Sequence, residues 1–201
     1  MLIVRDRIAA NLAAFPRRAL ATAGLRHAAV AILLSPRDGE LTYVLTRRAL
    51  TLRRNAGNYA LPGGNLEPGE DAVAGALRET AEELGVHLAR DAVLGLLDDF
   101  QTLGGHVVTP VVLWSPDPIR LDPDPVEVGR AWLEPVSGLD HPDAPMREAA
   151  PGGGEPILRM AADNTWVNPP TAAWLYQFRE VALHGRPVRV ATVGQPDWTA
   201  R

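Results

Sequence analysis

The segment that most constrains this chain runs from Gly63 to Val86 and reads GGNLEPGEDAVAGALRETAEELGV. It joins a glycine pair and a Pro-Gly turn to a stretch that carries Glu79, Glu82 and Glu83. Apolar residues recur around them at helical spacing, so we expect a helix that ends at Gly85. On that helix the three glutamates lie together, away from the apolar face. Their mutual repulsion must be offset by solvent, by an arginine or by bound cations.

The composition of this segment favours the cations. Carboxylate oxygens are the ligands that hard ions such as Mg²⁺ or Mn²⁺ prefer, and these ions also hold phosphate oxygens. Gly63 and Gly64 allow the backbone to approach a metal or a phosphate closely. Arg78 is placed to pair with Glu70 and so to brace the loop against the helix. Taken alone, the residues predict a divalent-metal site for phosphates, and the alternative is a solvated acidic helix.

The same segment resembles the Nudix hydrolase box, G-x5-E-x7-R-E-U-x-E-E-x-G-U, in which U is a bulky apolar residue. Thr80 stands at the first U position. The resemblance implies the Nudix-type α/β/α sandwich with a mixed β-sheet, and hydrolysis of a nucleoside diphosphate linked to another moiety. The positions that match are Gly64, Glu70, Arg78, Glu79, Glu82, Glu83, Gly85 and Val86.

The resemblance also implies roles for residues of the box. Glu79, Glu82 and Glu83 would bind Mg²⁺ or Mn²⁺, helped by the carbonyl of Gly64. Glu79, or a carboxylate outside the box, would activate the attacking water. Arg78 would orient Glu79 or Glu70. The bound metal would polarise the phosphoryl oxygens and lower the pKa of the water.

Residues 44–64, VLTRRALTLRRNAGNYALPGG, resemble the upstream motif of the coenzyme A pyrophosphatase branch. The matching positions include Arg48 and Arg53, which we expect to bind substrate together with Gly63 and Gly64. Three positions depart from that motif, namely Ala49, Asn55 and Leu61. Further candidates for the site are Arg47, Arg54, Glu70 and Glu127.

Three functions follow as hypotheses. The first is hydrolysis of the diphosphate linkage in coenzyme A or an acyl-coenzyme A, giving 3′,5′-ADP and (acyl-)4′-phosphopantetheine. Arginine forks match phosphate oxygens, and the 3′-phosphate of coenzyme A would use the additional arginines. The second is a Nudix pyrophosphatase for ADP-ribose, NADH or a nucleotide sugar. The third is a nucleotide-binding Nudix module without catalysis.

The composition limits the kinds of partner that we expect this chain to bind. The 201 residues carry a net charge of −4 and no cysteine. Binding to nucleic acid or to an anionic membrane is therefore unexpected, and disulfides and thiolate metal sites are excluded. No apolar run reaches the roughly 18 residues of a membrane span, so we expect a cytoplasmic protein. A small nucleoside-diphosphate substrate is the expected partner, and a homodimer stays open.

The pattern along the chain predicts an N-terminal helical extension at 1–24 and one Nudix domain at 25–201. Pro and Gly are dense at 115–156, where we expect long loops, and 140–156 reads as a lid or as disorder. Asp98 and Asp99 are candidates to line the cleft, and Trp174 is expected in packing. The expected helices are 5–21, 71–84 and 169–185, and the expected strands are 27–35, 41–48, a short one before the Pro-Gly-Gly turn, 92–100, 106–115 and 129–135.

Overall fold

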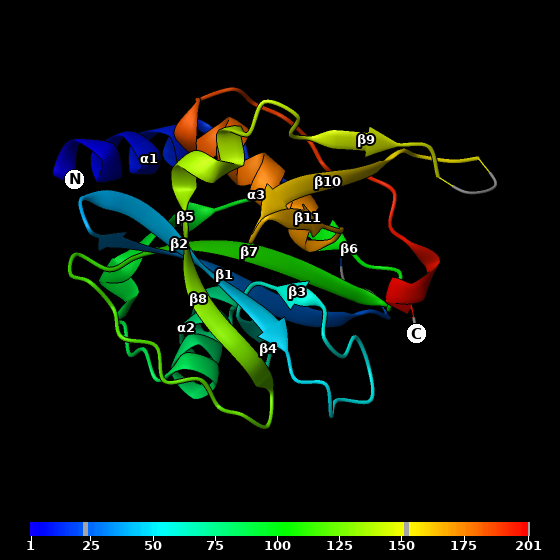
Figure 1. The fold of residues 1–201 in the computed structure, drawn as a ribbon, viewed down its shortest axis with the longest axis horizontal. Coiled ribbons are helices and arrows are strands. Elements are labelled where there is room, and N and C mark those ends of the chain that lie inside the picture. The colour runs from blue at the N-terminus through cyan, green and yellow to red at the C-terminus, as the bar shows by residue number, and fades with distance from the viewer. Residues whose placement is uncertain (22–23, 151–152, 201) are drawn as a thin grey trace.

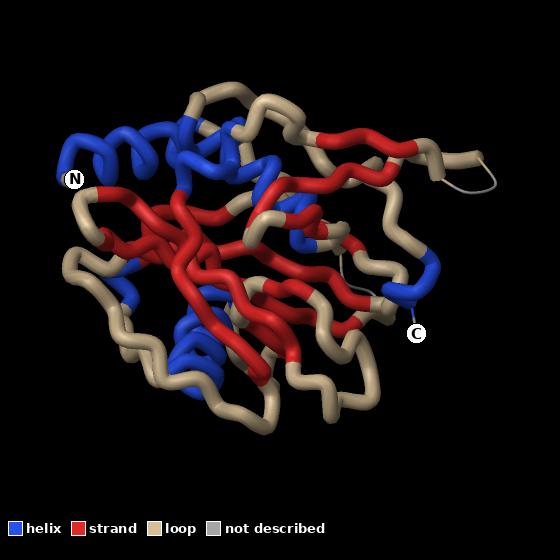
Figure 2. Tube along the Cα trace, in the orientation of Figure 1, coloured by secondary structure: helices blue, strands red, loops and turns tan. Residues whose placement is uncertain are grey.

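The computed structural model describes residues 1–21, 24–150 and 153–200. Strands form the middle of the molecule and helices lie on both sides of them (Figure 2). The main elements are α1 (Leu2–Ala14), β1 (Arg26–Arg37), β2 (Glu40–Arg48), β3 (Tyr59–Ala60), β4 (Gly63–Asn65), α2 (Ala72–Leu84), β5 (Val93–Leu96), β6 (Phe100–Gln101), β7 (His106–Trp114), β8 (Val128–Pro135), β9 (Met146–Glu148), β10 (Ile157–Ala162), β11 (Thr165–Val167) and α3 (Thr171–Phe178).

Strand β1 is the centre of a large mixed sheet. It runs parallel to β7 and antiparallel to β2 and β4. On one side the sheet continues from β2 to β3 and β8, and on the other from β7 to β5 and β6, always antiparallel. The hairpin between β1 and β2 turns at Asp38-Gly39, where both residues have positive φ. The two strands predicted on either side of this turn are confirmed.

Alternate residues of β1 face two separate apolar cores. Val30 and Ile32 pack with residues of α1 and α3, whereas Ala31 and Leu33 pack with residues of α2. Since successive side chains of a strand point to opposite faces, one central strand separates the two cores. Figure 1 shows α2 on one side of the sheet and α1 and α3 on the other. The predicted α/β/α sandwich with a mixed sheet is confirmed.

The first helix differs in its bounds from the prediction of 5–21. It ends at Ala14, because Pro16 cannot continue a helix and disfavours helical geometry in Phe15. Its apolar stripe, Ile8, Leu12 and Phe15, is buried in the core shared with α3. The helix therefore packs as part of that core.

Sequence patterns missed a second, three-stranded antiparallel sheet formed by β9, β10 and β11. Strand β9 lies in the Pro/Gly-rich region, where we expected long loops, and β10 and β11 follow that region, where no strand was predicted. The helix predicted at 169–185 is present as α3, extended by a π-helical turn at Arg179–Leu183. The predicted strand 92–100 is divided into β5 and β6.

Asp98 and Asp99, expected as candidates near the cleft, instead hold distant segments together. Asp99 pairs with Arg17 and accepts a hydrogen bond from Thr109 at 2.6 Å. Asp98 pairs with Arg189 at 2.8 Å. Both carboxylates are buried and fully occupied by these partners, which excludes the role suggested by their sequence position.

Candidate active site

Helix α2 presents the acidic residues of the box. Asp71 caps its N-terminus by accepting a hydrogen bond from the Ala74 N–H at 2.7 Å. Gly85 ends it in the left-handed conformation, with φ of 67°. Thr80, at the apolar position of the motif, is buried and donates to the Ala76 carbonyl at 2.7 Å. Its hydroxyl is thereby satisfied inside the helix.

The glycine pair brings the loop against this helix. The Gly63 N–H donates to Glu83 Oε2 at 3.2 Å. A Cβ on Gly63 would overlap the Ala29 carbonyl oxygen, so β4 could not pair closely with β1. A Cβ on Gly64 would overlap the carboxylate of Glu79. Position 63 thus requires glycine for close packing against the backbone of β1, whereas a side chain at position 64 would displace the carboxylate of Glu79.

Arg78 is the centre of a network of charged hydrogen bonds. It donates to both oxygens of Glu70 at 3.0 Å, as the sequence predicted. It also donates to Glu79 at 2.9 Å and to Glu82 at 2.8 Å. A further bond reaches the Asn65 carbonyl at 3.0 Å. One guanidinium therefore ties the loop to the helix and fixes the carboxylate of Glu79.

We had expected the three glutamates to lie together on one exposed side of the helix, but their exposure differs. The side chain of Glu82 is 60% exposed, whereas Glu83 is only 5% exposed. Burial, together with the charges of Glu79 and Glu127, raises the pKa of Glu83 to about 8. Burial also raises the pKa of Glu79, and Arg78 opposes that shift. The charges of Glu79 and of the exposed Glu127 thus act together on the buried carboxyl of Glu83.

The oxygen donors of this site indicate whether it can hold a divalent cation. Within residues 1–21, 24–150 and 153–200, no three His, Asp or Glu side chains converge into a complete metal cage. Mg²⁺ keeps several waters and is usually held by one or two carboxylates, so a complete cage is not required. Glu79 and Glu83 supply oxygen donors beside the glycine pair, and a cation would relieve their repulsion. The donor set fits Mg²⁺ or Mn²⁺.

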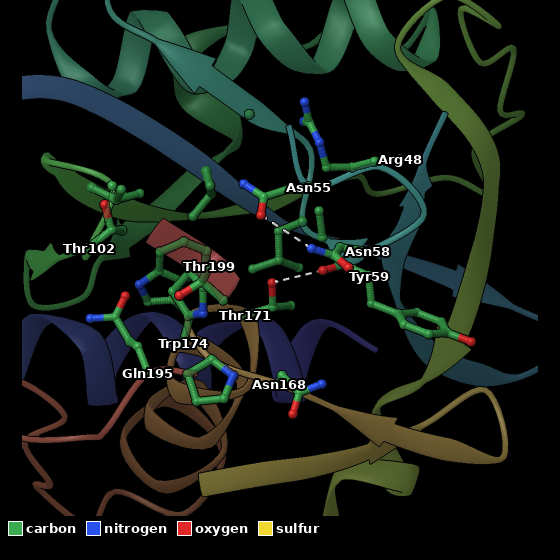
Figure 3. Close-up of a pocket in the computed structure, with 18 of the residues that line it drawn as sticks. Arg48, Asn55, Asn58, Tyr59, Thr102, Asn168, Thr171, Trp174, Gln195 and Thr199 are labelled. Carbon is green, nitrogen blue, oxygen red and sulfur yellow. Dashed lines mark hydrogen bonds between the residues drawn. The ribbon is translucent and has the colours of Figure 1, made fainter. Parts of the chain in front are cut away.

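A pocket of about 440 Å³ lies next to this acidic site. Gly63 and Arg48 belong to its lining, and Arg48 is close enough to Glu83 for its charge to lower the pKa of that carboxyl. Figure 3 shows the pocket between two groups of side chains. Arg48, Asn55 and Tyr59 come from β2, β3 and the loop that joins them, while Asn168, Thr171 and Trp174 come from α3 and the segment before it.

The four candidate arginines lie in different surroundings. Arg48 and Arg54 line the pocket, whereas Arg53 is exposed and is absent from the lining. Arg47 donates to the Gly57 carbonyl at 3.0 Å and so supports the loop before β3. Asn55, which departs from the coenzyme A motif, also lines the pocket.

Sequence reasoning missed the far wall of the pocket. Asn168, Thr171, Gln195 and Thr199 lie more than 100 residues after the glycine pair, and none of them was predicted as a site residue. Trp174 was expected in packing, and its ring does contact Phe100 edge to face at a centroid distance of 6.1 Å. It also lines the pocket. Asn168, Thr171 and Trp174 come from α3 and the segment before it, while Gln195 and Thr199 come from the C-terminal segment, so tertiary packing alone brings them together.

Comparison with known families identifies the family to which this chain belongs. A model of the NUDIX domain matches residues 25–150. The chain belongs to the NUDIX domain family. A relative from Photorhabdus laumondii, named "Uncharacterized Nudix hydrolase NudL", is 40% identical over 115 residues, 56% of this chain and 60% of that protein. The Escherichia coli K12 protein of the same name is 38% identical over 124 residues, 58% and 62% of the two chains.

The chain thus spans about six-tenths of the length of these relatives. Among solved structures, a NUDIX hydrolase from Alicyclobacillus acidocaldarius superposes with a TM-score of 0.51 at 17% identity, covering 81% of this chain and 93% of that one. This likeness concerns the fold. Across the described residues, no helix has both the length and the apolar character that a membrane crossing requires.

Proposed function

We propose that this chain is a Nudix-type pyrophosphatase that hydrolyses a diphosphate bond in a small nucleotide substrate. Mg²⁺ or Mn²⁺ would be held by Glu79, Glu82 and Glu83, with the Gly64 carbonyl. The observation that carries the proposal is the packing of Glu79 and Glu83 against the glycine pair. A buried carboxylate next to a half-buried one is stabilised by a compensating positive charge, which a divalent cation supplies while it also binds a phosphate.

The residues of the site would divide the reaction among them. When bound, the cation polarises the phosphoryl oxygens and lowers the pKa of a water molecule. Glu79 or Glu127 would accept a proton from that water as it attacks phosphorus. The bridging P–O bond then breaks, and two monophosphates leave. Arg78 would hold Glu79 in position, and Arg48 would pair with phosphate oxygens from the pocket side.

For the substrate we propose coenzyme A or an acyl-coenzyme A, cleaved to 3′,5′-ADP and (acyl-)4′-phosphopantetheine. The support is the upstream motif together with the charge of the pocket. Arg48 and Arg54 are in its lining, and no Asp or Glu is found there among the described residues. A substrate with a phosphate in addition to its diphosphate suits such a surface. ADP-ribose, NADH and nucleotide sugars are the alternative substrates, and nucleotide binding without cleavage is the alternative function.

Product analysis by mass spectrometry tests this proposal. The protein is incubated with Mg²⁺ or Mn²⁺ and, separately, coenzyme A, acetyl-coenzyme A, ADP-ribose, NADH and a nucleotide sugar. Release of 3′,5′-ADP and 4′-phosphopantetheine by the wild type, and not by Glu83→Gln, is the expected result. Cleavage of another substrate alone would overturn the coenzyme A assignment. Metal-dependent binding without cleavage of any substrate would favour the binding module.

A further inference from the structure

One side of the pocket is formed by strands β1 and β7, which extend from the box to a second end of the pocket. Val30 of β1 and Val108 of β7 both line it. Val30 pairs with Gly63 of the box, whereas Arg26, four residues earlier on β1, pairs with His106 of β7. Strand residues are spaced about 3.3 Å apart, so about 13 Å of strand separates the glycine pair from Arg26 and His106. The pocket therefore has an end that lies away from the carboxylates.

Basic side chains gather at this second end. His106 and Arg54 line the pocket, and Arg26 donates to the carbonyl of Gly104, another lining residue, at 3.4 Å. Because successive side chains of a strand alternate, Arg26 lies on the same face of β1 as Val30. Burial and the charge of Arg26, with a smaller contribution from Arg54, lower the pKa of the His106 ring. Both guanidinium groups are therefore close enough to act on that ring.

This basic cluster, Arg26, Arg54 and His106, has no carboxylate that balances its charge within the part of the chain that the structure describes. Neither arginine forms an ion pair there with an Asp or Glu side chain, and none of the described lining residues is acidic. Arg26 and Arg54 are exposed and His106 is partly exposed, so a ligand can reach all three side chains. Like charges that no acid offsets favour the binding of an anion between them.

An anion at the basic cluster is separate from the diphosphate, which the proposed function places at the box. Figure 3 shows Thr102 on the far side of the pocket from Arg48, and the Thr102 hydroxyl accepts a hydrogen bond from the His106 backbone N–H at 3.2 Å. A phosphate monoester carries nearly two negative charges and three strong acceptor oxygens. Arginine forks and an imidazole N–H supply the matching donors.

We propose that the basic cluster binds a phosphate monoester on the nucleoside part of the substrate, apart from the diphosphate that is cleaved. This deepens the proposed function and rests on it for the position of the diphosphate. The 3′-phosphate of coenzyme A and a 2′-phosphate on adenosine are two sources of such a group. ADP-ribose, NADH and nucleotide sugars lack it. The cluster would therefore select one class among the candidate substrates.

The direct test compares the affinities of AMP, 3′,5′-ADP and 2′,5′-ADP by calorimetry in EDTA, where metal-dependent cleavage cannot occur. One of the two bisphosphates should bind wild type at least about tenfold more tightly than AMP, and its identity distinguishes the two sources of the monoester. The double variant Arg54→Gln with His106→Gln should bind that bisphosphate no more tightly than AMP, with the affinity for AMP unchanged. Arg26→Gln provides an independent variant and should reduce the difference about threefold.

His27→Gln with Arg37→Gln is the matched control. Both residues are exposed on β1, His27 lies on the opposite face of the strand from Arg26, and Arg37 pairs with Asp38 at the other end. This variant should keep the full difference between the bisphosphate and AMP. Equal affinities of wild type for AMP and both bisphosphates would overturn the inference, as would no binding of either bisphosphate at millimolar concentration. A difference that persists in the Arg54 and His106 double variant would also overturn it.

Steady-state kinetics provide the second readout, with pairs of substrates that differ only in the monoester. The pairs are coenzyme A with dephospho-coenzyme A, and NADPH with NADH. For the pair that is cleaved, wild type should have a KM about tenfold lower for the phosphorylated member, with similar kcat, and the Arg54 and His106 double variant should have equal KM for both. Cleavage by wild type with equal KM for both members would overturn the inference and leave the proposed function standing. Cluster-dependent binding of a bisphosphate without cleavage of any substrate would do the reverse.

Discussion

The carboxylate site and the neighbouring pocket are built in opposite ways. The first is acidic, and all but one of its groups come from a single continuous segment, 63–86, with Glu127 added from a loop. The second has no acidic side chain among its described lining residues and draws on positions from 30 to 199. The proposed reactive groups are thus compact in sequence, whereas the neighbouring pocket is assembled from dispersed positions. The predictions below test that division.

The largest effect is expected from Glu83→Gln. The change keeps the shape of the side chain and removes its charge, so kcat should fall at least about a hundredfold with KM changed little. Glu67→Gln is the matched control, because Glu67 is an exposed glutamate in the same segment. Steady-state rates with the identified substrate provide the measurement. A Glu83→Gln enzyme within threefold of wild type would remove the acidic site from the mechanism.

Without metal, the stability of the protein should fall as pH rises. The pKa of Glu83 is raised from 4.5 to about 8 by burial and by Glu79 and Glu127, so the folded state binds more protons than the unfolded state between these values. The contribution of Glu83 to the free energy of unfolding is therefore fully present below about pH 4.5 and declines towards pH 8, by about 1.4 kcal/mol per pH unit at most.

Thermal unfolding in EDTA from pH 5 to 8.5 measures this effect. The melting temperature of wild type should fall more steeply than that of Glu83→Gln, and Mn²⁺ at pH 8 should restore much of the loss. Parallel curves for the two proteins would show that the pKa of Glu83 is not raised in the folded state.

Arg78→Lys should reduce kcat about tenfold. Lysine keeps the positive charge, but one ammonium cannot hold Glu70, Glu79 and Glu82 together as the guanidinium fork does. Arg90→Lys is the control, because Arg90 pairs with Asp71 on the exposed surface. Equal losses in the two variants would mean that the network around Arg78 has no particular role in positioning Glu79.

The smallest expected effect is a difference in KM between variants of two adjacent arginines, Arg53 and Arg54. Arg54→Ala should raise KM about threefold, since Arg54 lines the pocket, whereas Arg53→Ala should change it little. The measurement is KM for the same substrate at low ionic strength, where exposed charges are least screened. A larger rise in KM for Arg53→Ala than for Arg54→Ala would support binding of the substrate by Arg53, as the upstream motif predicts. The substrate would then lie away from the pocket.

Much of the acidic site could be predicted from sequence because its constraints are local. The helix, its Gly85 end and the pairing of Arg78 with Glu70 all depend on spacing within one segment. The burial of Glu83 could not be predicted that way. It arises because the Gly63 N–H and β4 cover that side of the helix, which is a tertiary contact.

The pocket and the second sheet could not be predicted from local sequence patterns. Strand β9 lies in the Pro/Gly-rich stretch, where local composition favoured loops. Asp98 and Asp99 looked like cleft residues until their partners Arg189 and Arg17 were known, and these lie about 80 to 90 residues away. Trp174 has no spacing that distinguishes a pocket residue from a core residue. Long-range packing decides each of these cases.

The measurement that tests the central claim most directly is a Mn²⁺ titration followed by backbone ¹⁵N NMR. A paramagnetic ion held by the box should broaden the amide signals of Gly63, Gly64 and Glu83 before any others, at substoichiometric Mn²⁺. Glu83→Gln should need much more Mn²⁺ for the same broadening. Early broadening around Asp98 and Asp99 instead, or no difference between the two proteins, would contradict the assignment of the metal to this site.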